Sequence, residues 1–307
     1  PRIEADEELV LTRLAEVDEL LREAPLALGH VPVEVEPGYV DPHHARQRNF
    51  VMDVNVAGTA QVLKAAADAG VKQFVYTSSN NVSFDREIIN GDETTPYATR
   101  PLDLYTETKG MAEKLVLDAD NGKTGMRTAA VRPGGIWGGS EGGVMITTFL
   151  EQLASGAFKA TVGDGSAVVD NTHVENLVYG EMLAAEKLVT DPDVAGGEAY
   201  YILDEEPMNG ILWFKPLAEG LGYTWPRMKV PKWLMYAIGY ITEVIHYLGG
   251  PEPSVSRISA LKITRSHTFS TAKARRDLGY EPRVGQIDGL KAILPHAREQ
   301  LERLKKK

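Results

Sequence analysis

The stretch Gln73-Phe74-Val75-Tyr76-Thr77-Ser78-Ser79 decides the fold, because it joins a short buried strand to small polar residues. Before it, residues 55–69 carry apolar side chains at helical spacing and end at Gly70. After a polar loop, residues 105–117 predict a second helix and residues 126–131 a second strand. This alternation of helices and strands is typical of an α/β doubly wound parallel sheet.

Both predicted strands end in residues suited to a ligand. Ser78 and Ser79 follow the first strand, and Arg132-Pro133-Gly134-Gly135 follows the second. In doubly wound sheets, ligands bind beyond the carboxyl ends of the strands. We therefore expect the two segments to lie on one rim of the sheet.

Composition excludes several classes of protein. The 307 residues include 33 Lys+Arg and 43 Asp+Glu, a formal net charge of −10, and 43% are apolar. These values exclude a disordered, collagen-like or coiled-coil chain. An acidic chain of this kind is not expected to bind nucleic acid, which attracts basic faces. The absence of Cys excludes disulfides, thiolate nucleophiles and Cys-ligated zinc.

Three further segments have recognisable patterns. Residues 5–24 predict an amphipathic helix, residues 31–38 a strand or a loop, and residues 198–203 a strand. Residues 233–248 are apolar but fall short of the ~20 residues that a membrane span needs. Two interpretations of this last segment stay open: a core helix, or a helix that lies on a membrane or gates a substrate.

The strongest chemical signal is Tyr105-Thr106-Glu107-Thr108-Lys109 at the start of a predicted helix. Residues four apart share a helix face, so the Lys109 ammonium can lie near the Tyr105 phenol. A neighbouring cation lowers the pKa of a phenol from about 10. Such a tyrosine can exchange a proton with an alcohol or ketone. Ser79, on the expected rim, can hydrogen-bond the same oxygen.

Other candidates have plainer explanations. His173 is expected to be a structural histidine at a strand end, and Asp170 and Glu175 beside it do not complete a metal site, so we expect no metal. The opening residues, from Pro1, do not resemble a signal peptide.

Seven segments in this order resemble the extended short-chain dehydrogenases/reductases, in particular their 3β-hydroxysteroid (sterol) dehydrogenase branch. The resemblance covers roughly residues 38–295. The segments are residues 55–59, 74–79, 104–109, 132–138, 169–176, 204–207 and 272–282.

The resemblance implies a catalytic group of three. Tyr105 is implied as the general acid/base, and Ser79 as the residue that binds the substrate oxygen. Lys109 is implied to lower the pKa of Tyr105 and to hold the nicotinamide ribose. Asn55 is implied to brace the helix beneath the site.

The resemblance also implies residues that contact the cofactor and the substrate. Thr77, Ser78, Tyr105 and Lys109 would line the cofactor, and Pro133, Gly134, Gly135 and Ile136 would pass over its nicotinamide. Asn80 and Trp137 would face the substrate, although Trp137 could equally be a core residue.

The implied reaction is NAD(P)-dependent oxidation of a 3β-hydroxysteroid to the 3-ketone, in some relatives with isomerisation or C4 decarboxylation. The cofactor is expected to be NAD, with NADP left open. We expect a Rossmann-like core at residues 38–180, a mainly substrate-binding region at 181–307 and an unassigned segment at 1–37. The protein is expected in the cytoplasm, free or in peripheral contact with a membrane. A homodimer through helices 55–69 and 105–117 is a further expectation.

One part of the family pattern is missing. A Gly-x-x-Gly-x-x-Gly turn should open the fold and let backbone N–H groups approach the pyrophosphate, yet the first glycines are Gly29 and Gly38. The first βαβ unit is therefore absent or altered in this sequence. Two alternatives stay open: a sugar-nucleotide epimerase or dehydratase of the same fold, and a non-catalytic relative that has lost its dinucleotide loop.

Overall fold

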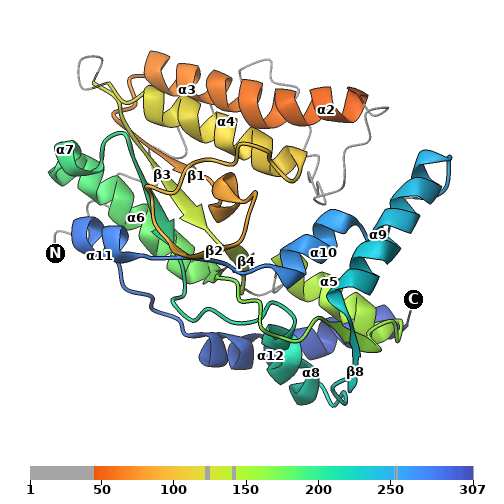
Figure 1. Ribbon diagram of the computed structural model, residues 1–307. Helices are drawn as coiled ribbons and strands as arrows, with labels where there is room; N and C mark the ends of the chain where they lie inside the picture. The colour runs from red at the N-terminus through yellow and green to blue at the C-terminus, as the bar shows by residue number, and fades with distance from the viewer. Residues whose placement is uncertain (1–44, 122–124, 140–142, 252, 254, 307) are drawn as a thin grey trace. The chain divides into compact units, whose positions relative to one another are not determined.

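The computed structural model describes residues 45–121, 125–139, 143–251, 253 and 255–306 (Figure 1). All of them belong to one compact unit, Pro37–Lys307. The predicted helix at 5–24, the segment at 31–38 and the place of the missing glycine turn lie outside the described residues.

A parallel three-stranded sheet forms the centre of this unit. Its strands are β1 (Gln73–Thr77), β3 (Arg127–Pro133) and β7 (Glu198–Ile202), in the order β1-β3-β7. Thr77 pairs with Val131, and Val131 with Tyr200, so the three carboxyl ends lie at the same edge. The predicted parallel α/β sheet is confirmed, and β1 has the predicted bounds.

Helices cover both faces of the sheet (Figure 1). On one face lie α2 (Ala45–Met52), the π-helical turn η1 (Asp53–Ala57), α3 (Gly58–Asp68) and α4 (Leu104–Asp118). Leu63 of α3 and Val116 of α4 pack there with Met126, just before β3. On the other face lie α6 (Val174–Thr190), α7 (Pro192–Ala195) and α11 (Ala272–Leu278), which form a second cluster around Tyr200 and Tyr280.

A separate hydrophobic core surrounds Trp137 at the end of β4 (Gly135–Trp137). It is built from α5 (Gly143–Ala154), the short helix η3 (Leu212–Phe214), α8 (Lys215–Gly220) and α12 (Gln286–Lys305). Along the chain, elements of this core alternate with elements of the cluster around Tyr200 and Tyr280. Of these elements, α5 precedes the expected boundary at residue 180 and β7 of the central sheet follows it.

Short strand pairs link these parts. β2 (Ile88–Gly91) pairs with β9 (His267–Phe269), β4 with β6 (Asn171–His173), and β5 (Ala160–Val162) with β8 (Met228–Val230), all parallel. A further short helix, η2 (Asn80–Ser83), follows β1.

The apolar stretch near residue 240 forms α9 (Lys232–Tyr247), which packs on α10 (Arg257–Thr264). Of its residues only Gly239 and Glu243 are buried. The core-helix interpretation is therefore wrong for this segment, because its apolar side chains face outward. No helix among the described residues is long and apolar enough to cross a membrane.

Candidate active site

The structure gathers Ser79, Tyr105 and Lys109 at the carboxyl end of β1. Ser79 is the N-cap of η2, where its hydroxyl accepts a hydrogen bond from the Asn81 N–H at 3.2 Å. Tyr105 lies in the first turn of α4, and Lys109 one turn later. The Asp103 carboxylate starts this helix by accepting from the Thr106 N–H at 2.7 Å.

The Ser79 hydroxyl lies close enough to the Tyr105 phenol to influence its pKa. Burial raises the pKa of Tyr105 above its ordinary value, the Ser79 hydroxyl lowers it in part, and the Asp103 carboxylate raises it further. The phenol is therefore protonated at neutral pH. In that state it can donate a proton to a carbonyl oxygen.

Lys109 is held differently from the expectation. Its ammonium donates to the Thr77 carbonyl oxygen at 2.6 Å and lies 4.4 Å from the centre of the Tyr76 ring. Burial lowers the pKa of Lys109 to about 8, against the opposing effect of the Glu113 carboxylate. The pKa of Tyr105 is raised, not lowered as expected, because burial of the phenol has the largest effect on it. Helical spacing alone could not reveal that burial.

A buried ion pair lies behind Lys109 and was not anticipated from the sequence. The Arg132 guanidinium binds the Glu113 carboxylate at 2.6 Å, and the two side chains are 4% and 0% exposed. The Tyr97 hydroxyl donates to the same carboxylate at 2.6 Å. Burial opposes ionisation of Glu113, but Arg132 prevails and holds its pKa below the usual value. Glu113 lies four residues after Lys109 on the same helix face, which is the signal that could have found it.

A second ion pair joins the start of α4 to α10. The Lys262 ammonium lies 2.5 Å from the Asp103 carboxylate, whose side chain is 1% exposed. Asp103 therefore caps α4 and binds a cation from a segment 159 residues away. This pair was also missed, since nothing in the spacing of Asp103 and Lys262 links them.

The segment Pro133–Ile136, expected to follow the second strand, joins two strands. β3 continues to Pro133 and β4 begins at Gly135. A Cβ on Gly134 would lie 2.3 Å from the Asp170 carbonyl oxygen, so close packing on the adjoining chain already requires this glycine. Ile136 is 43% exposed and is free to contact a ligand.

The remaining cofactor candidates lie close to the end of β1. The Thr77 hydroxyl donates to the Glu181 carboxylate at 2.5 Å, and the Ser78 N–H donates to the Val131 carbonyl oxygen at 2.7 Å. Ser78 and Asn80 are both buried. Asn55, which the resemblance implies braces the helix beneath the site, donates to the Thr108 hydroxyl of α4 at 3.0 Å.

Trp137 does not reach a surface that a substrate could touch. Its side chain is 0% exposed, and its indole N–H donates to the Asp204 carboxylate at 2.7 Å. The indole meets His173 and Trp213 edge to face. The substrate contact expected of Trp137 has no support in this placement, which fits the core alternative. His173 is structural, as expected: it caps α6 by accepting from the Glu175 N–H.

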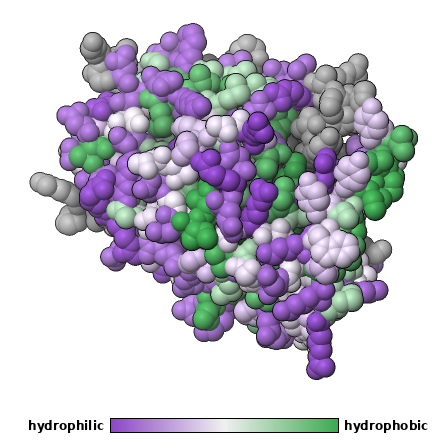
Figure 2. Space-filling model, in the orientation of Figure 1, coloured by the Kyte–Doolittle hydropathy of each residue, from purple (hydrophilic) through white to green (hydrophobic). Residues whose placement is uncertain are grey.

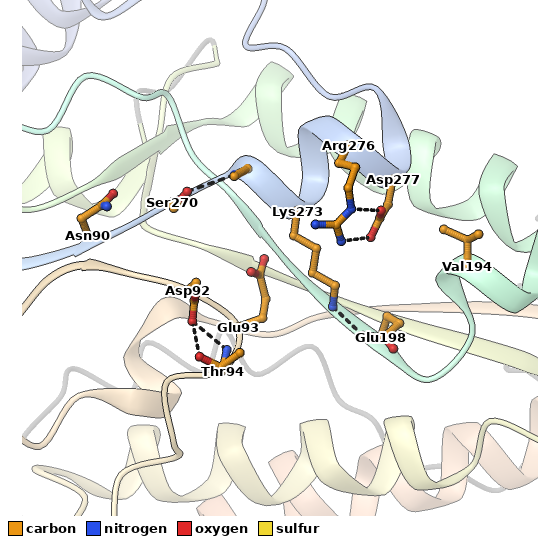
Figure 3. Close-up of a pocket in the computed structure, with 11 residues that line it drawn as sticks. Asn90, Asp92, Glu93, Thr94, Val194, Glu198, Ser270, Lys273, Arg276 and Asp277 are labelled. Atoms are coloured by element: carbon orange, nitrogen blue, oxygen red, sulfur yellow. Dashed lines mark hydrogen bonds and ion pairs between the residues drawn. The ribbon is translucent and has the colours of Figure 1, made fainter.

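A cavity of about 760 Å³ lies beside the amino end of β7 (Figure 3). It is lined by residues from the start of β7 and from α11, including Glu198, Lys273 and Arg276. β7 and β1 are opposite edges of the sheet, so this cavity is separate from the catalytic group. Its two cations are paired with carboxylates: Lys273 binds Glu198 at 2.5 Å, and Arg276 binds Asp277 at 2.7 Å. No group of three or more metal-ligating side chains occurs in the described part of the chain.

The residues at the end of β1 fit one half of a dinucleotide. The Ser79 and Tyr105 hydroxyls and the Lys109 ammonium are donors of the kind that a ribose and a substrate oxygen accept from. The glycine turn that would bind the pyrophosphate belongs before residue 45, outside the described residues. The fit is therefore to the nicotinamide end.

Comparison with known proteins gives three kinds of likeness. Residues 26–232 match the model of the 3-beta hydroxysteroid dehydrogenase/isomerase family. The "3 beta-hydroxysteroid dehydrogenase/Delta 5-->4-isomerase" of Mycobacterium tuberculosis is 43% identical, over 85% of this chain and 70% of that protein. A "3-beta-hydroxysteroid dehydrogenase" of Mycolicibacterium neoaurum is 38% identical, over 94% of this chain and 76% of that protein.

The likeness to solved structures concerns the fold alone. The dTDP-glucose 4,6-dehydratase of Streptomyces venezuelae, solved with NAD and TYD bound, has a TM-score of 0.61 at 20% identity. The match covers 85% of this chain and 71% of that one. The expected Rossmann-like architecture is thereby confirmed. The family match and the identity to curated relatives go further than the fold, and they show that this chain belongs to the 3-beta hydroxysteroid dehydrogenase/isomerase family.

Proposed function

We propose that this protein oxidises the 3β-hydroxyl of a steroid or sterol to a ketone, with NAD(P) as the cofactor. The observation that carries the proposal is the meeting of Ser79, Tyr105 and Lys109 at the carboxyl end of β1. Family membership supports the class of substrate.

Each of the three residues has a task. Ser79 holds the substrate oxygen next to the Tyr105 phenol. Tyr105 takes the hydroxyl proton during oxidation and returns it during reduction. Lys109, fixed on the Thr77 carbonyl oxygen, is placed to hold the ribose of the cofactor. The bound nicotinamide supplies the acceptor for the hydride that leaves the carbinol carbon.

The raised pKa of Tyr105 gives the two directions different pH dependences. Oxidation needs the phenolate, so its rate should rise as the pH approaches the pKa of Tyr105. Reduction needs the phenol, which is the neutral-pH form. A steroid ketone should therefore be reduced readily at pH 7, and the 3β-alcohol oxidised best under alkaline conditions.

The test is turnover by the full chain, followed by NADH absorbance. A 3β-hydroxysteroid should be oxidised and its 3α epimer should not. Tyr105→Phe should lower kcat about 10²- to 10⁴-fold, the usual contribution of a proton-transfer group, while the thermal midpoint stays unchanged. Turnover of a sugar nucleotide in place of the steroid would favour the epimerase alternative. Failure to bind NADH and NADPH would favour the non-catalytic one.

Three expectations stay proposals alongside this one. The region after residue 180 is proposed to bind the substrate, and the dimer is proposed to form through α3 and α4. Val62, Met111 and Leu115 on these two helices are 39%, 39% and 38% exposed, which supports the second. Peripheral contact with a membrane is the third of these proposals.

A further inference from the structure

Lys109 and Arg132 place two cations at the carboxyl ends of neighbouring strands. The Lys109 ammonium donates to the carbonyl oxygen of Thr77, the last residue of β1, at 2.6 Å. Thr77 pairs with Val131 of β3, so Arg132 is the next residue along the neighbouring strand. Because neighbouring strands lie about 4.8 Å apart, two cations held at these ends repel one another. The Arg132 side chain is 4% exposed, so water does little to screen the repulsion and a nearby anion is needed to offset it.

The Glu113 carboxylate is placed to face both cations. It lies four residues after Lys109 on α4, and side chains at this spacing share a helix face. It also binds the Arg132 guanidinium at 2.6 Å, and its own side chain is 0% exposed. Its negative charge counteracts the effect of burial on the pKa of Lys109. One carboxylate on α4 therefore compensates the cations at the ends of two strands.

Hydrogen bonds fix this carboxylate in one orientation. The Tyr97 hydroxyl donates to Glu113 Oε1 at 2.6 Å, and Arg132 Nε lies 3.1 Å and 3.0 Å from the two carboxylate oxygens. The Arg132 guanidinium in turn donates to the Tyr201 hydroxyl at 3.3 Å. A buried ion pair is often no more stabilising than apolar side chains of the same volume. The network is therefore better explained by its effect on the neighbouring Lys109 than by stability alone.

The other groups around Lys109 do not supply this charge. The Tyr76 ring lies 4.4 Å from the ammonium, and burial raises the pKa of both Tyr76 and Tyr105, so both phenols are neutral at pH 7. The Glu181 carboxylate accepts from the Thr77 hydroxyl at 2.5 Å, but it comes from α6, on the opposite face of the sheet from α4 (Figure 1). Three further carboxylates near α4 and β3 have partners of their own: Asp103 pairs with Lys262, Glu107 with Arg48, and Glu93 accepts from the Tyr201 N–H.

We propose that Glu113 is a positioning residue: its carboxylate keeps the Lys109 ammonium charged and directed at the end of β1, where the ammonium can hold the cofactor ribose. This role rests on the proposed function, because Glu113 acts on the cofactor only through Lys109. Without the carboxylate, the Arg132 guanidinium would repel the ammonium, and Lys109 would release its proton at a lower pH. A neutral amine has one donor fewer than an ammonium and carries no charge, so it binds ribose hydroxyls more weakly.

The first test is a pH titration of Lys109 in the full chain. Lysine labelled with carbon-13 at Cε is followed by NMR, and Lys109→Arg identifies the Lys109 signal. In the native chain the midpoint should lie at about pH 8. Glu113→Gln keeps the shape of the side chain and removes its charge, so the midpoint should fall below about pH 7. Glu113→Asp keeps the charge and should restore most of the difference.

Glu243→Gln is the matched control for the loss of a buried carboxylate. Like Glu113, Glu243 is buried and binds an arginine, Arg257 at 2.5 Å, but it belongs to α9. Both variants should lose stability, and only Glu113→Gln should move the Lys109 midpoint. Equal shifts in the two variants, or no shift in a folded Glu113→Gln chain, would overturn the proposal.

Tyr97→Phe provides a second variant in case Glu113→Gln does not fold. It removes only the hydroxyl that donates to Glu113, which leaves the carboxylate more strongly negative. The Lys109 midpoint should therefore rise, by about 0.3 of a pH unit. Tyr200→Phe removes a comparable hydroxyl, which donates to the Val194 carbonyl oxygen at 3.1 Å, and should leave the midpoint in place. A midpoint that falls or stays where it is in Tyr97→Phe would contradict the role of Glu113.

Binding of NADH connects the titration to the proposed function. At pH 7.5 Glu113→Gln should bind NADH roughly fivefold to tenfold more weakly than the native chain, because most of its Lys109 is uncharged. At pH 6 both proteins carry the ammonium, and the difference should shrink to less than about twofold. A loss of the same size at both pH values would assign Glu113 a merely structural role. If the native chain does not bind NADH, the proposed function fails, whereas the titration of Lys109 still decides the role of Glu113.

Discussion

Apolar side chains are usually buried and polar ones exposed, and helices α4 and α9 depart from this rule in opposite ways. α4 buries polar side chains, among them Thr106, Thr108 and Glu113, whereas α9 exposes nearly all of its apolar ones. Buried polar groups need partners, and exposed apolar groups gain from being covered. The comparison indicates different roles for the two helices. The buried polar side chains of α4 fix the helix that carries Tyr105 and Lys109, whereas the exposed apolar side chains of α9 are available to a partner (Figure 2).

The largest expected effect concerns Glu113. Glu113→Gln should lower the free energy of unfolding by about 3–5 kcal/mol, because it leaves the buried Arg132 guanidinium without its counter-charge. Chemical denaturation measures the change. Glu107→Gln is the matched control on the same helix, since Glu107 also pairs with an arginine, Arg48, but at the surface. That control should change the free energy of unfolding by less than about 1 kcal/mol. Equal losses of stability in the two variants would contradict the importance that we assign to the burial of Glu113.

Asp170 is another buried acid, and it is paired with the backbone. Its carboxylate accepts a hydrogen bond from the Phe269 N–H at 2.7 Å. Burial raises the pKa of Asp170 to about 7, far above its value in an unfolded chain. Between about pH 4 and 7 the folded state therefore binds a proton that the unfolded state has released. The stability that this proton supplies is complete below pH 4 and is lost as the pH rises through 7.

Asp170→Asn should consequently gain stability relative to the native chain as the pH rises from 4 to 8, by at most about 4 kcal/mol. Asparagine keeps the acceptor for the Phe269 N–H but cannot ionise. Denaturation curves at several pH values give the difference between the two proteins. A difference that is constant with pH would contradict the raised pKa.

Variants of Lys262 test whether the ion pair between Lys262 of α10 and Asp103 affects the pKa of Tyr105. Lys262→Met should move the pH profile of oxidation upward by less than about one unit, because Asp103 would raise the pKa of Tyr105 without a compensating cation. Asp103→Asn keeps a residue suited to the N-cap and should move the profile downward. Lys262→Arg should leave it in place. Shifts in the same direction for the Met and Asn variants would contradict this role.

The sequence predicted the elements whose formation depends on neighbouring residues, β1 and α4 among them. β1 was found with its observed bounds, since an apolar run between Gly70 and Ser78 is complete within a few residues. α4 was predicted within a residue of its ends, and it carries the Tyr105 and Lys109 that we propose to be catalytic. Ser79 was reached through the rule that ligands bind at the carboxyl ends of strands.

What the sequence could not predict depends on contacts between distant segments. The pairing of β4 with β6, which the small size of Gly134 and Gly135 allows, joins residues more than 30 positions apart. Trp137 is a core residue because α5, α8 and α12 converge on it from other parts of the chain. The burial that raises the pKa of Tyr105 has the same kind of origin, as does the link from Lys262 to Asp103.

The smallest expected effect comes from the exposed apolar side chains of α9, and it sharpens the contrast with α4. Ile241→Ser should change the free energy of unfolding by about 0.5 kcal/mol or less, because its side chain already faces water. Gly239→Ala, two residues earlier, should lower stability by about 1–3 kcal/mol, although alanine favours helix by about 1 kcal/mol. The reason is that a Cβ at Gly239 would lie 2.6 Å from the backbone nitrogen of Arg257. If Ile241→Ser destabilised the chain as much as Gly239→Ala, α9 would be a packed helix, and its outward face would need no partner at all.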